Sequence, residues 1–144
     1  MRVHQILKTK SDDGVVTLDP ETTVAQAAEL LAARKIGAVI VSTDGKQAQG
    51  ILSERDIVRE LGRRGTACMT DKVKAIMTPD PVSCTREEGS DDVFLKMSEG
   101  RFRHLPVIEN GEMIGLISIG DVVKARLSEL SMEKQALEGM IMGH

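Results

Sequence analysis

Two serine–aspartate pairs in this chain have the residue types and the spacing to hold a polar ligand. Each pair lies in a Gly-x-x-Ser-x-x-Asp run followed by two apolar residues. The first run contains Gly50, Ser53 and Asp56, and the second contains Gly115, Ser118 and Asp121. We expect each serine to begin a helix after a strand, where backbone N–H groups lack partners and the helix dipole favours an anion. The aspartate carboxylate can accept hydrogen bonds from hydroxyl groups, and the glycine lets the backbone pass close to a ligand.

The same spacing also has a purely structural interpretation. Ser-x-x-Asp before an apolar run is a capping-box pattern, in which the two side chains satisfy the first N–H groups of a helix without any ligand. A single copy of the run would favour this cap. Two copies in equivalent surroundings, together with the family resemblance carried by these runs, favour a ligand site, and one residue can serve both purposes when the ligand is absent.

Each run lies at the end of one copy of a longer pattern. The first copy begins at Val15 and the second at Pro81. An internal repeat places equivalent sites at equivalent positions. The sequence therefore predicts a pair of matched clefts rather than one active site. Each copy alternates strand, helix, strand, strand, helix. Because one copy alone is short, we expect the two to share one core.

In the first copy we expect a strand over Val15–Leu18 and then a helix that Thr23 and Gln26 begin as a capping box. A buried strand follows over Ala38–Val41, and Asp44-Gly45 indicates a hairpin into the strand before Ser53. The apolar face of the helix consists of Val24, Ala27, Ala28 and Leu31.

In the second copy Val82 is expected to begin the first strand, and Val93 and Met97 to lie on the inner face of the first helix. Gly89-Ser90 replaces the capping residues of the first copy, so this helix has a weaker start. Asn110-Gly111 indicates a tight hairpin between two strands.

A short lead-in helix is expected before each copy, because Val3, Ile6 and Leu7 recur at the same spacing as Val73, Ile76 and Met77. The predicted organisation is a first repeat with its lead-in helix over 1–62 and a linker over 63–72. A second repeat follows over 73–128, and then a C-terminal helical tail over 129–144.

The tail carries a heptad-like apolar seam. Val123, Leu127, Leu130, Leu137 and Ile141 follow each other at intervals of four, three, seven and four, with Lys134 at the missing position. Such a seam is typical of a helix–helix contact. It predicts either a last helix packed on its own domain or a dimer contact, and the sequence leaves both open.

The composition is that of a globular protein, with 144 residues, 41% hydrophobic and 28% charged side chains and a net charge of −3. This charge gives no nucleic-acid footprint, and the near absence of aromatic residues disfavours base stacking. No apolar run is long enough to predict a membrane span. Cys68 and Cys84 are too far apart for a CxxC motif. We expect both to be reduced, and the protein to be cytoplasmic.

Catalysis is not expected. The histidines His4, His104 and His144 are scattered, and neither a nucleophile–histidine set nor a metal-ligand cluster can be read from the spacing. The chain also lacks a phosphate-binding loop motif and a GxGxxG fingerprint. The sequence therefore predicts a binding module without catalytic cofactor or metal.

Three pieces of the chain resemble the CBS domain, the cystathionine-β-synthase-type module, in tandem. These are GILSERDIV at 50–58, FRHLPV at 102–107 and GLISIGDVV at 115–123, and the similarity extends from Val3 to about Leu127. The resemblance implies an α/β fold of two β-α-β-β-α repeats that pack through their sheets with pseudo-two-fold symmetry, to which the tail adds a C-terminal helix. It also implies two clefts that bind adenosyl ligands such as AMP, ADP, ATP, NAD(H) or S-adenosylmethionine, a sensing role, and a homodimer.

The resemblance also assigns expected roles within the clefts. Asp56 and Asp121 would take a ribose, and Ser53 and Ser118 the sugar or phosphate. The basic side chains expected at the phosphates are Arg103 and His104 in the second copy and Arg55 in the first. Adenine would contact backbone at Val16, Thr17, Val82 and Ser83, between apolar walls at Leu52 and Ile117.

Because only the second copy carries Arg103 and His104, we expect its cleft to bind an anionic nucleotide better. The predicted function is a regulatory module that senses energy or redox state through AMP, ATP or NAD(H) and signals to an unidentified regulated protein. S-adenosylmethionine is the less expected ligand. The alternative is a ligand-free structural or dimerisation module.

Overall fold

The computed structural model describes residues 1–10 and 14–142 of the chain. It forms two compact units that interleave along the sequence. Unit 1 consists of the described parts of Met1–Asp12, Cys84–Leu105 and Ile117–His144, and unit 2 of those of Asp13–Ser83 and Pro106–Leu116. The predicted α/β class and the two repeats are confirmed.

Unit 2 contains a four-stranded sheet in the order β1-β2-β3-β4. Its strands are β1 (Thr17–Leu18), β2 (Ala38–Val41), β3 (Gly50–Ser53) and β4 (Thr78–Pro79). β1 runs parallel to β2, and the other neighbouring strands are antiparallel. β1 is shorter than the predicted strand over Val15–Leu18, and β4 was not predicted. Pro79 lacks an N–H, so β4 fits only at the edge of the sheet.

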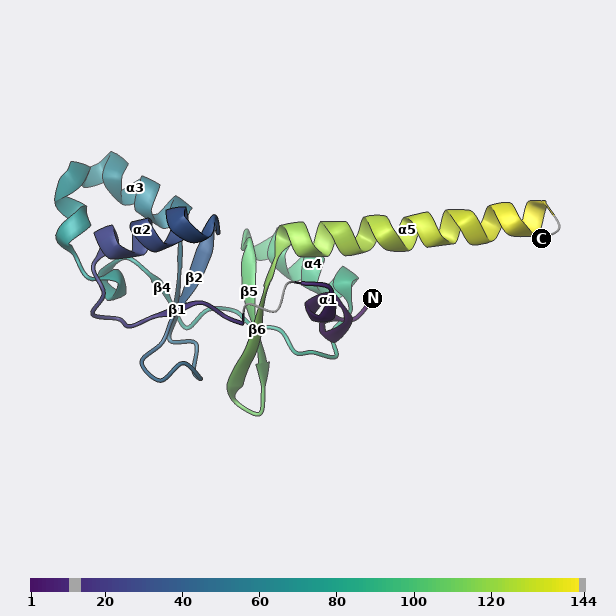
Figure 1. The fold of residues 1–144 in the computed structure, drawn as a ribbon, viewed down its shortest axis with the longest axis horizontal. Helices are drawn as coiled ribbons and strands as arrows, with labels where there is room; N and C mark the ends of the chain where they lie inside the picture. Colours follow the sequence, from purple (N-terminus) through teal and green to yellow (C-terminus); the bar gives the residue numbers. More distant parts are fainter. Residues whose placement is uncertain (11–13, 143–144) are drawn as a thin grey trace. The chain divides into compact units, whose positions relative to one another are not determined.

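Two helices pack on this sheet, α2 (Val24–Arg34) and α3 (Glu54–Arg64) (Figure 1). The predicted capping box begins α2, because the Thr23 side chain accepts from the Gln26 N–H at 3.2 Å and Gln26 accepts from the Thr23 N–H at 3.0 Å. α2 ends at Arg34, and its C-cap Lys35 lies in the left-handed region with φ of 54°. The core between these helices and the sheet of unit 2 consists of Val24, Ala27, Leu31, Val39, Val41, Leu52, Ile57 and Val73.

The segment predicted as a linker over 63–72 is largely helical. α3 continues to Arg64, and η1 (Gly65–Thr70) follows it as a 3-10 helix with Cys68 buried. The second lead-in is a single 3-10 turn, η2 (Val73–Ala75), rather than an α-helix. Val73 is buried in the core of unit 2, so this lead-in stabilises the unit that contains the first repeat's sheet.

Unit 1 contains three helices: α1 (Val3–Thr9), α4 (Ser90–Gly100) and α5 (Ile119–Ile141). α1 and α4 both contact α5 and lie beside its first half (Figure 1). The hydrophobic residues of these helices that are almost fully buried are Val3, Ile6, Val93, Met97, Val122 and Ala125, and the polar Ser90 is buried with them. The predicted weak start of α4 is confirmed, since its N-cap Gly89 has no side chain to cap the helix. The N–H of Val3 donates to the Glu88 carbonyl at 2.9 Å, which ties α1 to the segment before α4.

The remaining strands are β5 (His104–Glu109) and β6 (Glu112–Ser118), which form a two-stranded sheet. Asn110 and Gly111 have φ of 52° and 78°, as a two-residue type I′ turn requires. The predicted hairpin is therefore confirmed. The strand expected at Val82 is wrong: Val82 lies outside the named strands, after Asp80 with φ of 45° and Pro81, which has no N–H to donate to a ladder.

The apolar seam of α5 does not face its own unit. Val122 and Ala125 are the buried residues of this helix, whereas the seam residues Val123, Leu127, Leu130, Leu137 and Ile141 are all exposed. Leu127 is 63% exposed and Ile141 is 79% exposed. Packing on the chain's own domain therefore does not explain the seam. Among the described helices none is long and apolar enough to cross a membrane.

Candidate functional site

The first serine–aspartate pair forms a complete capping box at the start of α3. Ser53 ends β3 in an extended conformation, and its hydroxyl accepts from the Asp56 N–H at 3.3 Å. Asp56 Oδ2 accepts from the Ser53 N–H at 2.9 Å and from the Ser53 hydroxyl at 3.1 Å. The structural interpretation of this pair is therefore confirmed, and it leaves the carboxylate rigidly oriented at the helix N-terminus.

Arg59 holds the other oxygen of the Asp56 carboxylate. Its guanidinium donates to Asp56 Oδ1 at 2.6 Å from one turn further along α3. Only 10% of the Asp56 side chain is exposed. Both oxygens are thus engaged, so a hydroxyl ligand would have to exchange with Arg59.

The second pair forms the same box at the start of α5. Asp121 Oδ2 accepts from the Ser118 N–H at 2.8 Å, and the Ser118 hydroxyl accepts from the Asp121 N–H at 3.1 Å. Lys10, the C-cap residue that follows α1, places its ammonium nitrogen 2.8 Å from the same Oδ2. None of the described residues donates to Oδ1, and 22% of the side chain is exposed. Asp121 is therefore the more accessible carboxylate.

The charge state of Asp121 follows from these contacts. Burial alone would raise its pKa, but the hydrogen bonds from Lys10 and from the Ser118 backbone outweigh burial and lower the pKa below 3.8. Asp121 is thus ionised at neutral pH and accepts hydrogen bonds only.

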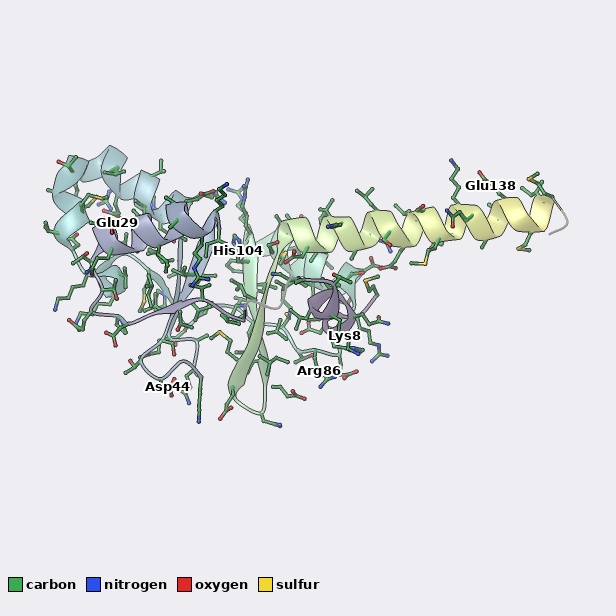
Figure 2. All side chains as sticks on the ribbon, in the orientation of Figure 1. Lys8, Glu29, Asp44, Arg86, His104 and Glu138 are labelled. Atoms are coloured by element: carbon green, nitrogen blue, oxygen red, sulfur yellow. The ribbon has the colours of Figure 1, made fainter. Side chains whose placement is uncertain are left out.

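Arg103 is positioned at the N-terminus of α5. Its carbonyl accepts from the Ile119 N–H at 2.8 Å, and in the first repeat the Gly37 carbonyl accepts from the Glu54 N–H at 2.9 Å. Arg103 and Gly37 are therefore equivalent positions in the two repeats. Arg103 is exposed, and His104 is half-buried at the first residue of β5 (Figure 2).

The two helix N-termini consequently carry different charges. α3 begins with Glu54, Arg55 and Asp56 next to an uncharged Gly37. α5 begins with Ile119, Gly120 and Asp121 next to Arg103. The first turn of α3 therefore carries two acidic residues, Glu54 and Asp56, whereas that of α5 carries only Asp121 and lies next to the backbone of Arg103.

The register of β1 directs one backbone edge outward. The Ile40 N–H donates to the Val16 carbonyl at 3.2 Å and the Ser42 N–H to the Leu18 carbonyl at 2.8 Å. Because hydrogen-bonding groups alternate along a strand, the N–H and C=O of Thr17 point away from β2. β1 is the edge strand, so these groups lie on the open side of the sheet. Ser53 pairs with Ala38 at the start of β2, whereas Thr17 lies opposite Ile40, two residues further along β2.

Gly50 has a packing role that the motif did not suggest. A Cβ at this position would lie 2.3 Å from Met77 Sδ, so the missing side chain makes room for Met77. Leu52 and Ile117, the predicted apolar walls, are fully buried.

The predicted site residues are divided between the two units. Val16, Thr17, Gly50, Ser53, Arg55 and Asp56 all belong to unit 2, and Arg103, His104, Ile117, Ser118 and Asp121 to unit 1. Val82, Ser83 and Gly115, which were predicted for the second copy, belong to unit 2.

Sequence reasoning missed Arg59 and Lys10. Arg59 follows Asp56 at an i,i+3 spacing that could have indicated it, whereas no local pattern connects Lys10 with Asp121.

Cysteine and metal chemistry find no support among the described residues. Cys68 and Cys84 are both free and buried, and burial raises the pKa of Cys84 to about 12. Its thiol is therefore protonated and inert at neutral pH. Residues 1–10 and 14–142 contain no group of three or more His, Cys, Asp or Glu side chains that could hold a metal ion.

Comparison with known proteins finds one family. The model of the CBS domain matches residues 6–63 and 73–128. The mitochondrial CBS domain-containing protein CBSX3 from Arabidopsis thaliana is 36% identical over 141 residues, which are 94% of this chain and 68% of that protein. Several other curated relatives from the same plant are longer, and the chain spans 22% to 23% of their length.

Solved structures agree. The CBS-domain protein ATU1752 from Agrobacterium tumefaciens has a TM-score of 0.83 and 44% identity, covering 88% of this chain and 99% of that one. The CBS domain protein PAE2072 from Pyrobaculum aerophilum, solved in complex with AMP, has a TM-score of 0.77 and 26% identity, covering 92% and 99%.

Proposed function

The chain belongs to the CBS-domain family as a tandem CBS pair, and from this premise we propose that it is a regulatory module that binds an adenine nucleotide. The family is generally non-catalytic. The observation that carries the proposal is the Ser118–Asp121 box at the start of α5, in which no described residue donates to Asp121 Oδ1. The Arg103 backbone is hydrogen-bonded to the first residue of the same helix.

The ribose is the part of the ligand that Asp121 suits. Two neighbouring hydroxyl groups can donate to one carboxylate, and Asp121 Oδ1 receives no donor from the described residues. The capping box fixes the direction of the carboxylate before any ligand binds. A preoriented acceptor loses less conformational entropy on binding.

The phosphate is the part that the α5 N-terminus and Arg103 suit. Helix N-termini favour anions, and a guanidinium presents several donors to phosphate oxygens. The relative that was solved with AMP supports a nucleotide monophosphate as the first ligand to test. ADP, ATP and NAD(H) share the adenosine and phosphate chemistry and remain within the proposal, with S-adenosylmethionine as the less expected adenosyl ligand.

Unit 2 supplies the corresponding features for a second, weaker site. The outward N–H and C=O of Thr17 can bond the polar edge of adenine, and Asp56 lies at the start of α3. Arg59 already occupies Asp56 Oδ1, and Glu54 adds a negative charge. We therefore propose unequal affinities, with the Asp121 site the stronger.

Titration calorimetry with AMP, ADP, ATP, NAD(H) and S-adenosylmethionine tests this proposal, with GMP as the control nucleotide. Asp121→Asn keeps the side-chain shape but gives up the charge and an acceptor, so AMP affinity should fall about tenfold or more. Asp56→Asn should affect only the weaker site. The matched control is Asp92→Asn, an exposed aspartate in the first turn of α4. A wild-type protein that binds none of the adenosyl ligands would refute the proposal.

A second candidate function has its own observation. Both boxes are complete without a ligand, and α5 leaves an apolar seam exposed. A structural or dimerisation module would show these features and would give no heat with any nucleotide, while still self-associating.

A further inference from the structure

The second half of α5 projects from its unit without packing partners. The side-chain contacts that fix α5 end at Glu129, which the amino group of Met1 contacts at 2.8 Å and the Ser90 hydroxyl at 3.1 Å. From 130 to 142 every residue is exposed except Gly139, which is half-buried. In this described stretch the one ion pair joins Lys134 and Glu138 of the same helix, at 3.9 Å.

Such a segment is not stable by itself. A helix of about 13 residues is marginal in water, even with good helix-forming residues, and Gly139 weakens it further. The exposed side chains are also apolar where a solvated helix would be polar, which marks an interaction surface. Figure 2 shows this part of α5 with Glu138 labelled near its end. A partner that covers the seam would supply the missing stabilisation.

The seam has the spacing of a two-helix contact. Leu127, Lys134 and Ile141 occupy one heptad position, and Val123, Leu130 and Leu137 the other. The flanking positions on one side are Lys124, Ser131 and Glu138, and those on the other side are Arg126, Glu133 and Met140. Both the seam and its flanks are therefore defined well enough to compare possible pairings.

A parallel pairing of two copies is unfavourable. It places Lys134 opposite Lys134 of the second copy in the centre of the seam. It also places Glu133 beside Glu138 of the second copy, on both sides of the contact. Like charges at these positions oppose association.

An antiparallel pairing removes these conflicts. With its centre at Met132, Leu127 meets Leu137 of the second copy, Val123 meets Ile141, and Lys134 meets Leu130. Lys124 then lies beside Glu138 of the second copy, at both ends of the contact. The two Glu133 side chains approach each other next to the two Lys134 ammonium groups, which offset their repulsion.

We propose that α5 is a self-association helix that pairs antiparallel with α5 of a second copy of this chain. The seam is exposed rather than buried on its own unit, and the charge pattern favours the same chain in the opposite direction. This contact is independent of nucleotide binding, so either proposal can fail without the other.

Sedimentation velocity over a range of concentrations tests the contact. The wild-type chain should associate into a species of twice the monomer mass. The double variant Leu130→Glu/Leu137→Glu places two charges in the seam and should weaken association about a hundredfold or more. The matched control, Met132→Glu/Gln135→Glu, adds the same charge outside the seam and should leave association within about twofold. Circular dichroism confirms that each variant is folded.

Charge reversal tests the direction. Glu138→Lys places Lys124 beside a lysine in the antiparallel pair and should weaken association about fivefold. Lys124→Glu/Glu138→Lys should restore it. In a parallel pair Glu138→Lys would instead strengthen association, by pairing with Glu133.

A wild-type chain that stays monomeric, a dimer that Leu130→Glu/Leu137→Glu leaves unchanged, or a stronger dimer with Glu138→Lys would each overturn the proposal. The first of these results would assign the seam to a different partner.

Discussion

At the residue scale, the two aspartates differ mainly in the cation that each one holds. Arg59 reaches Asp56 from the same helix, whereas Lys10 reaches Asp121 from α1. The Lys10 contact therefore depends on how α1 packs on α5, and a ligand on Asp121 would compete with it.

Replacing Lys10 with alanine should tighten AMP binding. The change removes the cation that competes for Asp121 Oδ2, and a partly exposed ion pair contributes up to about 1 kcal/mol, so the gain should be about two- to fivefold. Titration calorimetry measures it, with Lys8→Ala on the same helix as the control. Weaker binding would show that Lys10 contacts the nucleotide instead.

The acid stability of the protein should depend on Asp121. Its pKa is lowered from 3.8 in the folded state, so the stabilisation is complete well above 3.8 and is lost as pH falls through the lower folded value. Urea unfolding of wild type and Asp121→Asn from pH 7 to pH 3 measures this. The wild-type advantage should be constant from pH 7 to about pH 5 and shrink below pH 4. An advantage that grows on acidification would contradict the assignment.

At the element scale, the capping boxes were predictable because a cap is a local pattern. Thr23–Gln26, Ser53–Asp56 and Ser118–Asp121 each lie within four consecutive residues, and each forms the predicted hydrogen bonds. β4 and η1 were not predicted, because their pairing and burial come from residues distant in sequence. The exposure of the α5 seam could not be predicted either, because a helix with the same apolar spacing can bury that face against its own domain.

Ser118→Ala separates the cap from the ligand site. The loss of an N-cap should lower the free energy of unfolding by about 1 kcal/mol without any nucleotide. Ser118→Asp, which keeps a capping acceptor, should recover part of the loss. Urea denaturation measures both. An unchanged midpoint in Ser118→Ala would mean that the box does not stabilise α5.

Gly50→Ala tests the packing role of the first motif glycine. The new Cβ would meet Met77 Sδ at 2.3 Å, so Met77 has to shift, and overpacking should cost about 1 kcal/mol or more. Met77→Ala in the same chain should relieve the clash and leave a double variant less destabilised than the two single changes predict together. Strict additivity in thermal unfolding would argue against this contact.

At the scale of the whole molecule, the sequence repeats and the compact units are not the same segments. Unit 1 takes α1 from the start of the chain and α4 and α5 from its second half. Unit 2 takes η2 and most of the β5–β6 hairpin, Pro106–Leu116, in addition to the first repeat's sheet. The repeat pattern predicted the order of the elements but not this exchange, because lead-in segments carry no signal for which core buries them.

Because each unit contains segments from both halves of the chain, cutting the chain between the repeats should leave neither unit complete. A fragment over 1–72 lacks Val73, which is fully buried in the core of unit 2. A fragment over 73–144 lacks α1, whose Val3 and Ile6 are buried in unit 1. Each loss resembles the emptying of a core site, which costs about 2–5 kcal/mol per large side chain and is comparable with a small domain's whole stability. Each fragment alone should therefore give the poorly dispersed proton NMR spectrum of an unfolded chain, and mixing the two should restore dispersion. A well-dispersed spectrum from either fragment alone would show that one repeat folds without the exchanged segments.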